Sequence, residues 1–166
     1  MSALMTSART GTGRDDWRTP QCVIDRVLEV GPIVLDPCSA PDSLVPAAER
    51  IMLPDDGLEA PWPAVGLVYV NPPFSRLRPW LERVARWGRI GGETIALVPA
   101  RTDTRAWQDH ATGAAAVCFW RGRIRFVGAS AGAPFPTAFL YFGPRVGRFV
   151  AAFESAGAVY PGPVSR

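Results

Sequence analysis

The residues Leu67-Val68-Tyr69-Val70-Asn71-Pro72-Pro73-Phe74 decide the fold of this 166-residue chain. The first four are apolar or aromatic without interruption, as is typical of a strand buried on both faces of a sheet. The last four form a polar turn whose two prolines lock φ and remove two N–H donors. A short buried strand that ends in such a turn indicates an open α/β sheet, which binds ligands at the carboxyl ends of its strands.

The turn from Asn71 to Phe74 carries a specific set of chemical groups. The Asn71 side chain and the Pro72 carbonyl are rigidly placed acceptors, and Phe74 adds a flat apolar ring. Together they suit a planar heterocycle with an exocyclic amino group. Two fixed acceptors would draw the amino nitrogen of adenine or cytosine toward tetrahedral geometry and free its lone pair for reaction. The alternative interpretation is an ordinary Asn-Pro-Pro surface turn.

Strands alternate with helices on both sides of this turn. Strands are expected at residues 33–35, 51–53, 66–70, 94–98, 116–120, 124–126, 137–142 and 159–160. Helices are expected after a Thr19 N-cap with Pro20 in the first position, at 47–50 as a single turn, at 77–87, from Thr102 or Asp103 to His110, and from 146 to 153. This pattern predicts one α/β domain, a Rossmann-like, mostly parallel sheet with helices on both faces and an antiparallel edge.

Composition fits a single globular domain with a mildly basic charge. The net charge is +3 and the isoelectric point is near 9.1, which permits nucleic acid as a partner. Three isolated cysteines and one histidine predict neither a disulfide framework nor a metal site, and favour a reducing cytoplasm. No run predicts a membrane span. Residues 1–14 are expected to be a flexible basic arm and residues 15–166 the domain. The sequence makes no prediction of oligomeric state.

Acidic residues follow two of the expected early strands. Asp36 ends the first strand and could pair with a ligand ammonium group, while Asp55 or Asp56 could accept hydrogen bonds from a ribose or an adenine. Helix capping and a plain turn are the alternatives. No Gly-x-Gly-x-x-Gly fingerprint follows a strand, which disfavours a dinucleotide. Only 35 residues separate Asp36 from Asn71, so the second strand–helix unit must be abbreviated.

Basic residues interleaved with aromatic ones follow the later strands, an arrangement that suits a phosphate backbone with splayed bases. A solvated surface is the alternative for any single arginine. The expected substrate-side residues are Arg76, Arg101, Thr102, Asp103, Arg121, Arg123 and Arg125.

Several motifs in this order resemble the phage-type Dam family of DNA N6-adenine methyltransferases. They are Trp17-Arg18-Thr19-Pro20, Asp36-Pro37-Cys38-Ser39-Ala40, Asp56-Gly57-Leu58, Asn71-Pro72-Pro73-Phe74, Pro99-Ala100-Arg101-Thr102-Asp103-Thr104 and Gly122-Arg123-Ile124-Arg125-Phe126. The resemblance runs from about Asp16 to about Phe142, and the ordered set is more specific than any single motif.

This resemblance implies a class I fold that binds S-adenosylmethionine at the strand ends and acts on double-stranded DNA in a bacterial or phage-infected cytoplasm. The target base would be flipped onto Asn71, Pro72, Pro73 and Phe74. Asp36 would contact the donor's methionine amino group, Thr19 and Pro20 would line its methionine end, and Asp56 would contact its adenine. The full set implied for the donor is Trp17, Thr19, Pro20, Asp36, Pro37, Cys38, Asp55 and Asp56.

The leading hypothesis is therefore methylation of adenine N6 in DNA. Because the turn recognises an amino group rather than a particular ring, N4 of cytosine and the amino group of an RNA base remain alternatives. A nucleic-acid-binding module with a vestigial donor pocket is the alternative from another functional class.

Overall fold

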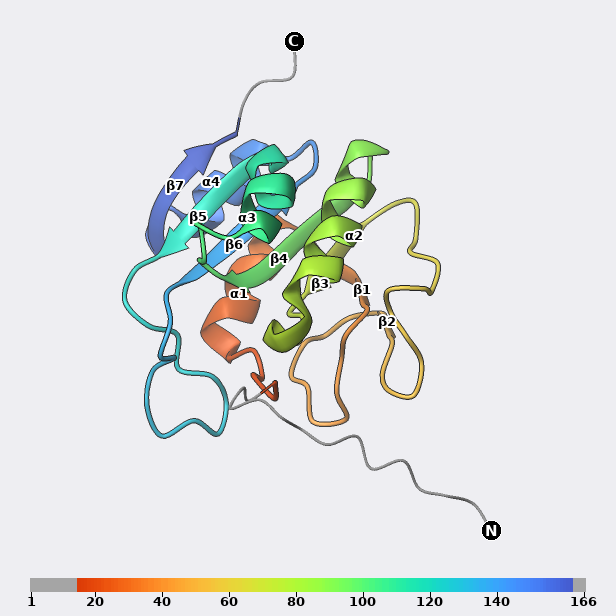
Figure 1. Cartoon of the computed structure of the whole chain (residues 1–166), viewed down its shortest axis with the longest axis horizontal. Helices are drawn as coiled ribbons and strands as arrows, with labels where there is room; N and C mark the ends of the chain where they lie inside the picture. Colours follow the sequence, from red (N-terminus) through yellow and green to blue (C-terminus); the bar gives the residue numbers. More distant parts are fainter. Residues whose placement is uncertain (1–14, 163–166) are drawn as a thin grey trace.

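The computed structural model describes residues 15–162, so the expected basic arm at residues 1–14 lies outside the described residues. These residues form one seven-stranded sheet with the strand order β2-β1-β3-β4-β6-β5-β7 (Figure 1). The strands are β1 (Ile33–Asp36), β2 (Glu49–Arg50), β3 (Leu67–Val70), β4 (Glu93–Pro99), β5 (Ala116–Trp120), β6 (Thr137–Phe142) and β7 (Gly157–Pro161).

The sheet is parallel on one side and antiparallel on the other. β2, β1, β3 and β4 pair in parallel, whereas the pairs β4–β6, β6–β5 and β5–β7 are antiparallel. Antiparallel pairs thus make up half of the strand pairings, whereas the sequence predicted a mostly parallel sheet with an antiparallel edge. The reason is that β5 connects to β6 through a loop without a crossover helix, and only a crossover allows parallel neighbours.

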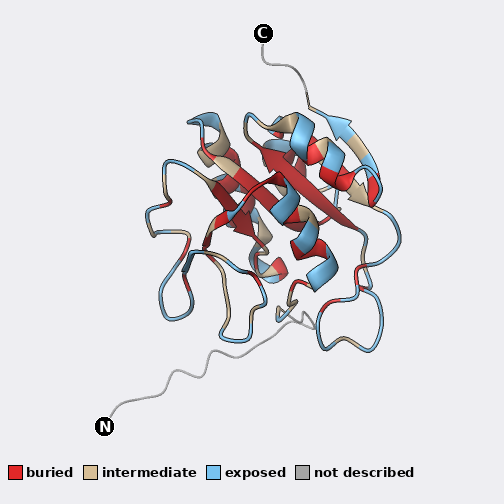
Figure 2. Cartoon of the chain, turned by 180° about the vertical axis from the view of Figure 1, so that it is seen from behind, coloured by how far each residue is buried: buried red, intermediate tan, exposed pale blue. Residues whose placement is uncertain are grey.

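Helices cover both faces of the sheet, as predicted. The helices are α1 (Gln21–Val30), α2 (Leu77–Arg89), α3 (Arg105–His110) and α4 (Val146–Phe153), with 3-10 turns η1 (Phe74–Arg76) and η2 (Ala111–Gly113). α1 and α4 share one apolar core, and α2 and α3 share the other. Alternate strand residues supply the two cores, so the central strands are buried, whereas the edge strands β2 and β7 and the outer helix faces are largely exposed (Figure 2).

Helix α2 shows how the sequence specifies this layer. Trp80, Leu81, Val84 and Ala85 are buried on its inner face, with the spacing of an amphipathic helix. Its outer face carries arginines, and Gly91 follows the helix with φ of 92°, a left-handed conformation that favours glycine.

Three local expectations were wrong. The second strand is Glu49–Arg50 rather than 51–53, and it replaces the expected helical turn, because Glu49 and Arg50 pair with Leu35 and Asp36. Residues 124–126 form no strand, since the backbone carbonyls of Ile124 and Phe126 bond within their own loop, to Ala133 and Ala129, rather than to the sheet. The N-cap of α3 is Thr104, whose hydroxyl accepts the Trp107 N–H at 3.3 Å.

A hydrogen-bond cluster lies where β4 begins, at the end of the sheet opposite the carboxyl ends of its parallel strands. Tyr141 donates its hydroxyl to Glu93 at 2.6 Å, and the Arg145 guanidinium donates two hydrogen bonds to the same carboxylate at 2.7 and 2.9 Å. This charge-assisted cluster joins β6 and the start of α4 to β4.

Candidate active site

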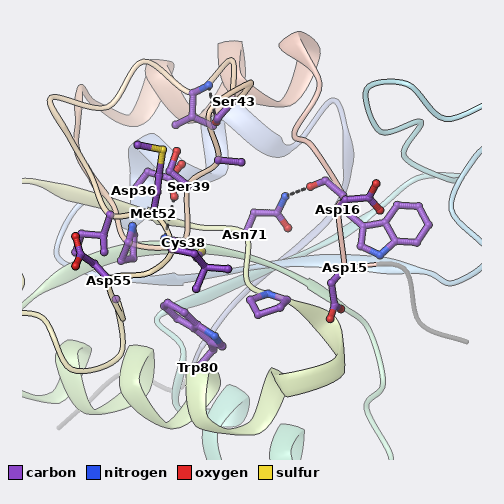
Figure 3. Close-up of a pocket in the computed structure, with 18 of the residues that line it drawn as sticks. Asp15, Asp16, Asp36, Cys38, Ser39, Ser43, Met52, Asp55, Asn71 and Trp80 are labelled. Atoms are coloured by element: carbon purple, nitrogen blue, oxygen red, sulfur yellow. Dashed lines mark hydrogen bonds between the residues drawn. The ribbon is translucent and has the colours of Figure 1, made fainter. Parts of the chain in front are cut away.

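A cavity of about 730 Å³ lies at the carboxyl ends of β1 and β3. Three stretches of chain line it: the strap Asp15–Thr19, the two loops between β1 and β3, and the turn that follows β3. Figure 3 shows Asp36, Ser39 and Met52 on one side of the cavity and Asn71 between them and Asp15. Asp36 and Asn71 therefore share one cavity, as their positions at neighbouring strand ends predicted.

Ten of the residues expected in the site line this cavity: Trp17, Thr19, Asp36, Pro37, Cys38, Asp55, Asp56, Asn71, Pro73 and Arg76. Pro20, Pro72 and Phe74 adjoin lining residues without lining the cavity themselves. The remaining expected residues lie on other loops at the same edge and are exposed: Arg101, Thr102, Asp103, Arg121, Arg123 and Arg125.

The side-chain amide of Asn71 is held in one orientation. Its Nδ2 donates to the backbone carbonyl of Trp17 at 2.5 Å and to the hydroxyl of Thr19 at 3.1 Å. Since both amide hydrogens are used, the oxygen Oδ1 points the other way. Oδ1 is buried and has no hydrogen-bond partner within residues 15–162. A buried acceptor without a partner carries a desolvation cost that an incoming donor would relieve.

Thr19 does not cap helix α1, contrary to the sequence prediction. The N-cap is Pro20, and no side chain hydrogen-bonds to the first turn. The hydroxyl of Thr19 instead lies 3.0 Å from the Tyr69 hydroxyl and accepts the Asn71 amide. Tyr69 was read from the sequence only as part of an apolar strand. Its hydroxyl, unusual in a fully buried strand, was the signal that could have identified it.

Phe74 is buried at 6% exposure in a cluster of aromatic rings. Its ring lies 5.4 Å from Phe135, 6.4 Å from Phe126 and 6.5 Å from Trp17, measured between centroids. The two phenylalanines meet it edge-on, whereas the Trp17 ring is tilted from it by only 23°. The structure thus does not present Phe74 as an open stacking face.

Asp36 is a buried carboxyl group at 4% exposure. Burial raises its pKa from 3.8 to about 6, although the nearby Ser39 hydroxyl, the Cys38 N–H at 3.3 Å and the charge of Arg50 oppose this shift. Both described ion pairs lie elsewhere in residues 15–162, so no cation pairs directly with Asp36. The cavity wall thus holds a costly carboxylate that a ligand cation would stabilise.

The two loops between β1 and β3 pack closely on each other at Gly57. A Cβ atom at this position would lie 1.7 Å from the carbonyl oxygen of Pro37, so only glycine allows the contact. The Gly57 carbonyl accepts the indole N–H of Trp62 at 2.9 Å, and Asp56 accepts the Leu58 N–H at 2.9 Å. The loop after β1 contains no glycine, so the glycine that allows the two loops to pack closely lies in the second loop.

The strap Asp15–Thr19 is tied to both sides of the cavity. Asp15 accepts the backbone N–H of Ser75 at 3.0 Å, Arg18 forms an ion pair with Asp42 at 2.7 Å, and the Arg18 backbone forms an antiparallel bridge with Val127. Neither Asp15 nor Arg18 was predicted as a site residue, because their contacts depend on tertiary structure rather than on a local motif.

Other features of the described residues are simple. Cys22, Cys38 and Cys118 are free thiols, and burial raises the pKa of Cys38 well above its usual value. Within residues 15–162, no three His, Cys, Asp or Glu side chains are grouped to hold a metal ion. None of the helices in that range has the length and apolar character of a membrane span.

Comparison with known proteins gives one match. The family model described as DNA N-6-adenine-methyltransferase (Dam) matches residues 6–139, which is most of the chain. A search of curated proteins found no match.

The burial of Asp36 makes a pH-dependent prediction for Asp36→Asn. The pKa of this carboxyl is about 6 in the folded protein and 3.8 in its ordinary state, so the folded state holds the proton more tightly. The stability that Asp36 contributes by holding this proton is therefore fully present below about pH 4, and it is lost as the pH rises through 6. Asp36→Asn should raise the free energy of unfolding at pH 7.5 by up to about 3 kcal/mol.

Urea denaturation of both proteins between pH 4 and 8 measures this difference, which should shrink toward zero near pH 4. Asp109→Asn, at an exposed aspartate on α3, is the matched control and should leave the unfolding free energy nearly unchanged. A variant no more stable than the parent at pH 7.5 would contradict the burial argument.

Proposed function

The chain belongs to the Dam family of DNA N6-adenine methyltransferases, and we propose that this enzyme takes its methyl group from S-adenosylmethionine and acts on an adenine flipped out of the duplex. The observation that carries the proposal is the buried Oδ1 of Asn71, which has no hydrogen-bond partner within residues 15–162 and belongs to a residue that lines the same cavity as Asp36. Residues 15–166 would form the single catalytic domain. The turn alone selects an amino group, and family membership selects adenine.

The residues of the cavity fit the donor. S-adenosylmethionine, when bound, supplies an electrophilic methyl group on a sulfonium. Asp36 would pair with its ammonium group, which would relieve the cost of the buried carboxylate. Pro37 and Cys38 would border the methionine portion together with the strap, and Asp55 and Asp56, which are exposed at the other end of the cavity, would receive the ribose and adenine.

Asn71 would act on the other reactant. Its Oδ1 and the Pro72 carbonyl would each accept one hydrogen of the adenine amino group. Two acceptors fixed in place stabilise the positive charge that develops on the nitrogen as it loses conjugation with the ring. The Asn71 amide needs no reorientation during the reaction, because the Trp17 carbonyl and Thr19 already hold it. Asn71 is not a base, so the proton would leave after methyl transfer.

Stacking of the base on Phe74 would require the aromatic cluster to open. The Trp17 ring covers Phe74 nearly parallel to it, with 23° between the planes, in the manner of a stacked base. We propose that the flipped adenine replaces part of the contact that Trp17 and Phe135 make with Phe74. The cluster would then keep this apolar surface out of water until DNA arrives.

The exposed arginines at the same edge would bind the DNA backbone. β4 and β5 run in the same direction as β3, so the loops that follow them lie at the edge that holds Asn71 (Figure 1). Arg101 follows β4, and Arg121, Arg123 and Arg125 follow β5. Thr102 and Asp103 border the same loop as Arg101, and Arg76 lies at the rim of the cavity.

Replacement of Asn71 tests the proposed role. Asn71→Ala should lower the rate of methyl transfer to DNA by at least about 10²-fold to 10³-fold, because an acceptor aimed at developing charge is lost. Calorimetric binding of S-adenosylhomocysteine should be little changed. Gln21→Ala removes an exposed amide that bonds to Asp25 on α1, and should keep the parent rate. Full activity of Asn71→Ala would refute the assignment.

Salt dependence tests the proposed DNA surface. Arg101→Ala and Arg123→Ala should each weaken DNA binding and reduce the slope of log K against log salt concentration by about 0.9. Arg148→Ala is the charge-matched control, because Arg148 is exposed on α4 at the opposite edge of the sheet. Fluorescence anisotropy with a labelled duplex measures both quantities. Equal losses in all three variants would indicate a non-specific charge effect and contradict the proposed surface.

A further inference from the structure

Behind Asn71 lies a short chain of buried hydroxyl groups, in which Thr19 lines the cavity and Tyr69 is not among the lining residues. Tyr69 is 1% exposed and Thr19 is 5% exposed, and their hydroxyl oxygens lie 3.0 Å apart. Thr19 in turn accepts one hydrogen of the Asn71 amide at 3.1 Å. Tyr69 and Asn71 are two residues apart, so a strand that continues into the turn places them on the same face.

We propose that Thr19 and Tyr69 are positioning residues that fix the polarity of the Asn71 amide, so that its oxygen faces the amino group of the substrate. The inference rests on the proposed function of Asn71 and deepens it. It gives Thr19 a different role from the lining of the donor that the family resemblance implied.

The two ends of a side-chain amide have nearly the same shape. Rotation by 180° exchanges the oxygen and the NH₂ group of Asn71 at little steric cost, and the reversed side chain would point hydrogens at an amino group that also needs acceptors. The Trp17 carbonyl opposes this reversal, since it can only accept. A hydroxyl can donate or accept, so Thr19 opposes it only if its own hydrogen is engaged elsewhere.

Tyr69 can engage the Thr19 hydrogen, which is the condition under which Thr19 opposes the reversal. With the Thr19 hydrogen directed to the Tyr69 oxygen, Thr19 can only accept from Asn71. The positioning role therefore requires Thr19 to be the donor of this pair, because a tyrosine that donated would leave the Thr19 hydrogen free to bond a reversed amide. Burial raises the pKa of Tyr69, so the phenol stays protonated and the arrangement holds across the working pH range.

The position of Tyr69 supports a role for its hydroxyl. The strand β3 is buried throughout, and its other three residues are leucine and valine. A phenylalanine would fill the same apolar space without burying a hydroxyl, which is costly unless it is hydrogen-bonded. Thr19 is the hydrogen-bond partner that the structure gives the Tyr69 hydroxyl, and the ion pair of Arg18 with Asp42 holds the strap that presents it.

Three variants separate this role from a structural one. Tyr69→Phe keeps the ring, Thr19→Val keeps the shape of the side chain, and Thr19→Ser keeps the hydroxyl. Tyr69→Phe and Thr19→Val should lower kcat about tenfold, the equivalent of one hydrogen bond, with the KM for S-adenosylmethionine unchanged. Thr19→Ser should restore most of kcat. Tyr141→Phe is the matched control, since it removes a buried hydroxyl from the Glu93 cluster and should leave kcat unaltered.

A spectroscopic readout tests the geometry without turnover. Asn71 is the only asparagine in the chain, so ¹⁵N-asparagine labelling gives a single side-chain NH₂ signal. Hydrogen bonds to Trp17 and Thr19 should protect both of its protons from exchange. Thr19→Val and Tyr69→Phe should shift this signal and speed its exchange, whereas Tyr141→Phe should not.

Several outcomes would overturn the inference. Parent kcat and an unshifted Asn71 signal in Tyr69→Phe would do so, even if Thr19→Val fails to fold. A raised donor KM with unchanged kcat in Thr19→Val would make Thr19 a donor-binding residue instead. Active Asn71→Ala would refute the proposed function itself, whereas inactive Asn71→Ala with fully active Tyr69→Phe would refute only the positioning role.

Discussion

The candidate site depends on one constraint, the fixed orientation of the Asn71 side-chain amide. The carbonyl of Trp17 and the hydroxyl of Thr19 accept both hydrogens of the Asn71 amide, and its oxygen is buried without a hydrogen-bond partner within residues 15–162. Neither partner is close to Asn71 in the sequence. The strap that carries them is itself held by Asp42, Ser75 and Val127, so the amide is preorganised by contacts on both sides of the cavity.

In the proposed function, the rest of the fold would bring two reactants to this amide. The parallel half of the sheet places Asp36 and Asn71 at neighbouring strand ends, and the loops that meet at Gly57 would form the donor side. The antiparallel half sends the arginine-bearing loop after β5 to the same edge. Burial raises the pKa of Asp36 to about 6, so the ionised carboxylate lowers the stability of the fold, and a bound ammonium group would offset this cost.

Much of this was predictable from sequence because the signals are local. The apolar run of β3, the amphipathic spacing of α2 and the strong strand β6 all lie within one or two residues of their expected bounds. The abbreviated unit between Asp36 and Asn71 followed from chain length alone, and the structure has only the two-residue β2 there. The family was recognised from an ordered set of motifs, and the family match over residues 6–139 confirms it.

What the sequence missed depends on tertiary contacts. Thr19 has the local pattern of an N-cap, but its hydroxyl hydrogen-bonds to Asn71 and Tyr69 instead. Ile124 and Phe126 alternate with an exposed residue as in a strand, yet both are buried in a loop. Phe74 was expected as an open stacking plate, and only the packing of Trp17 and Phe135 shows that it is covered. No local pattern distinguishes these cases.

The identity of the methylated nucleoside tests the account most directly. Unmethylated duplex DNA would be incubated with this enzyme and methyl-labelled S-adenosylmethionine, digested to nucleosides and separated. An oriented acceptor beside a bound sulfonium predicts label in N6-methyldeoxyadenosine. Label only in N4-methyldeoxycytidine, or none in DNA although the donor binds, would contradict it.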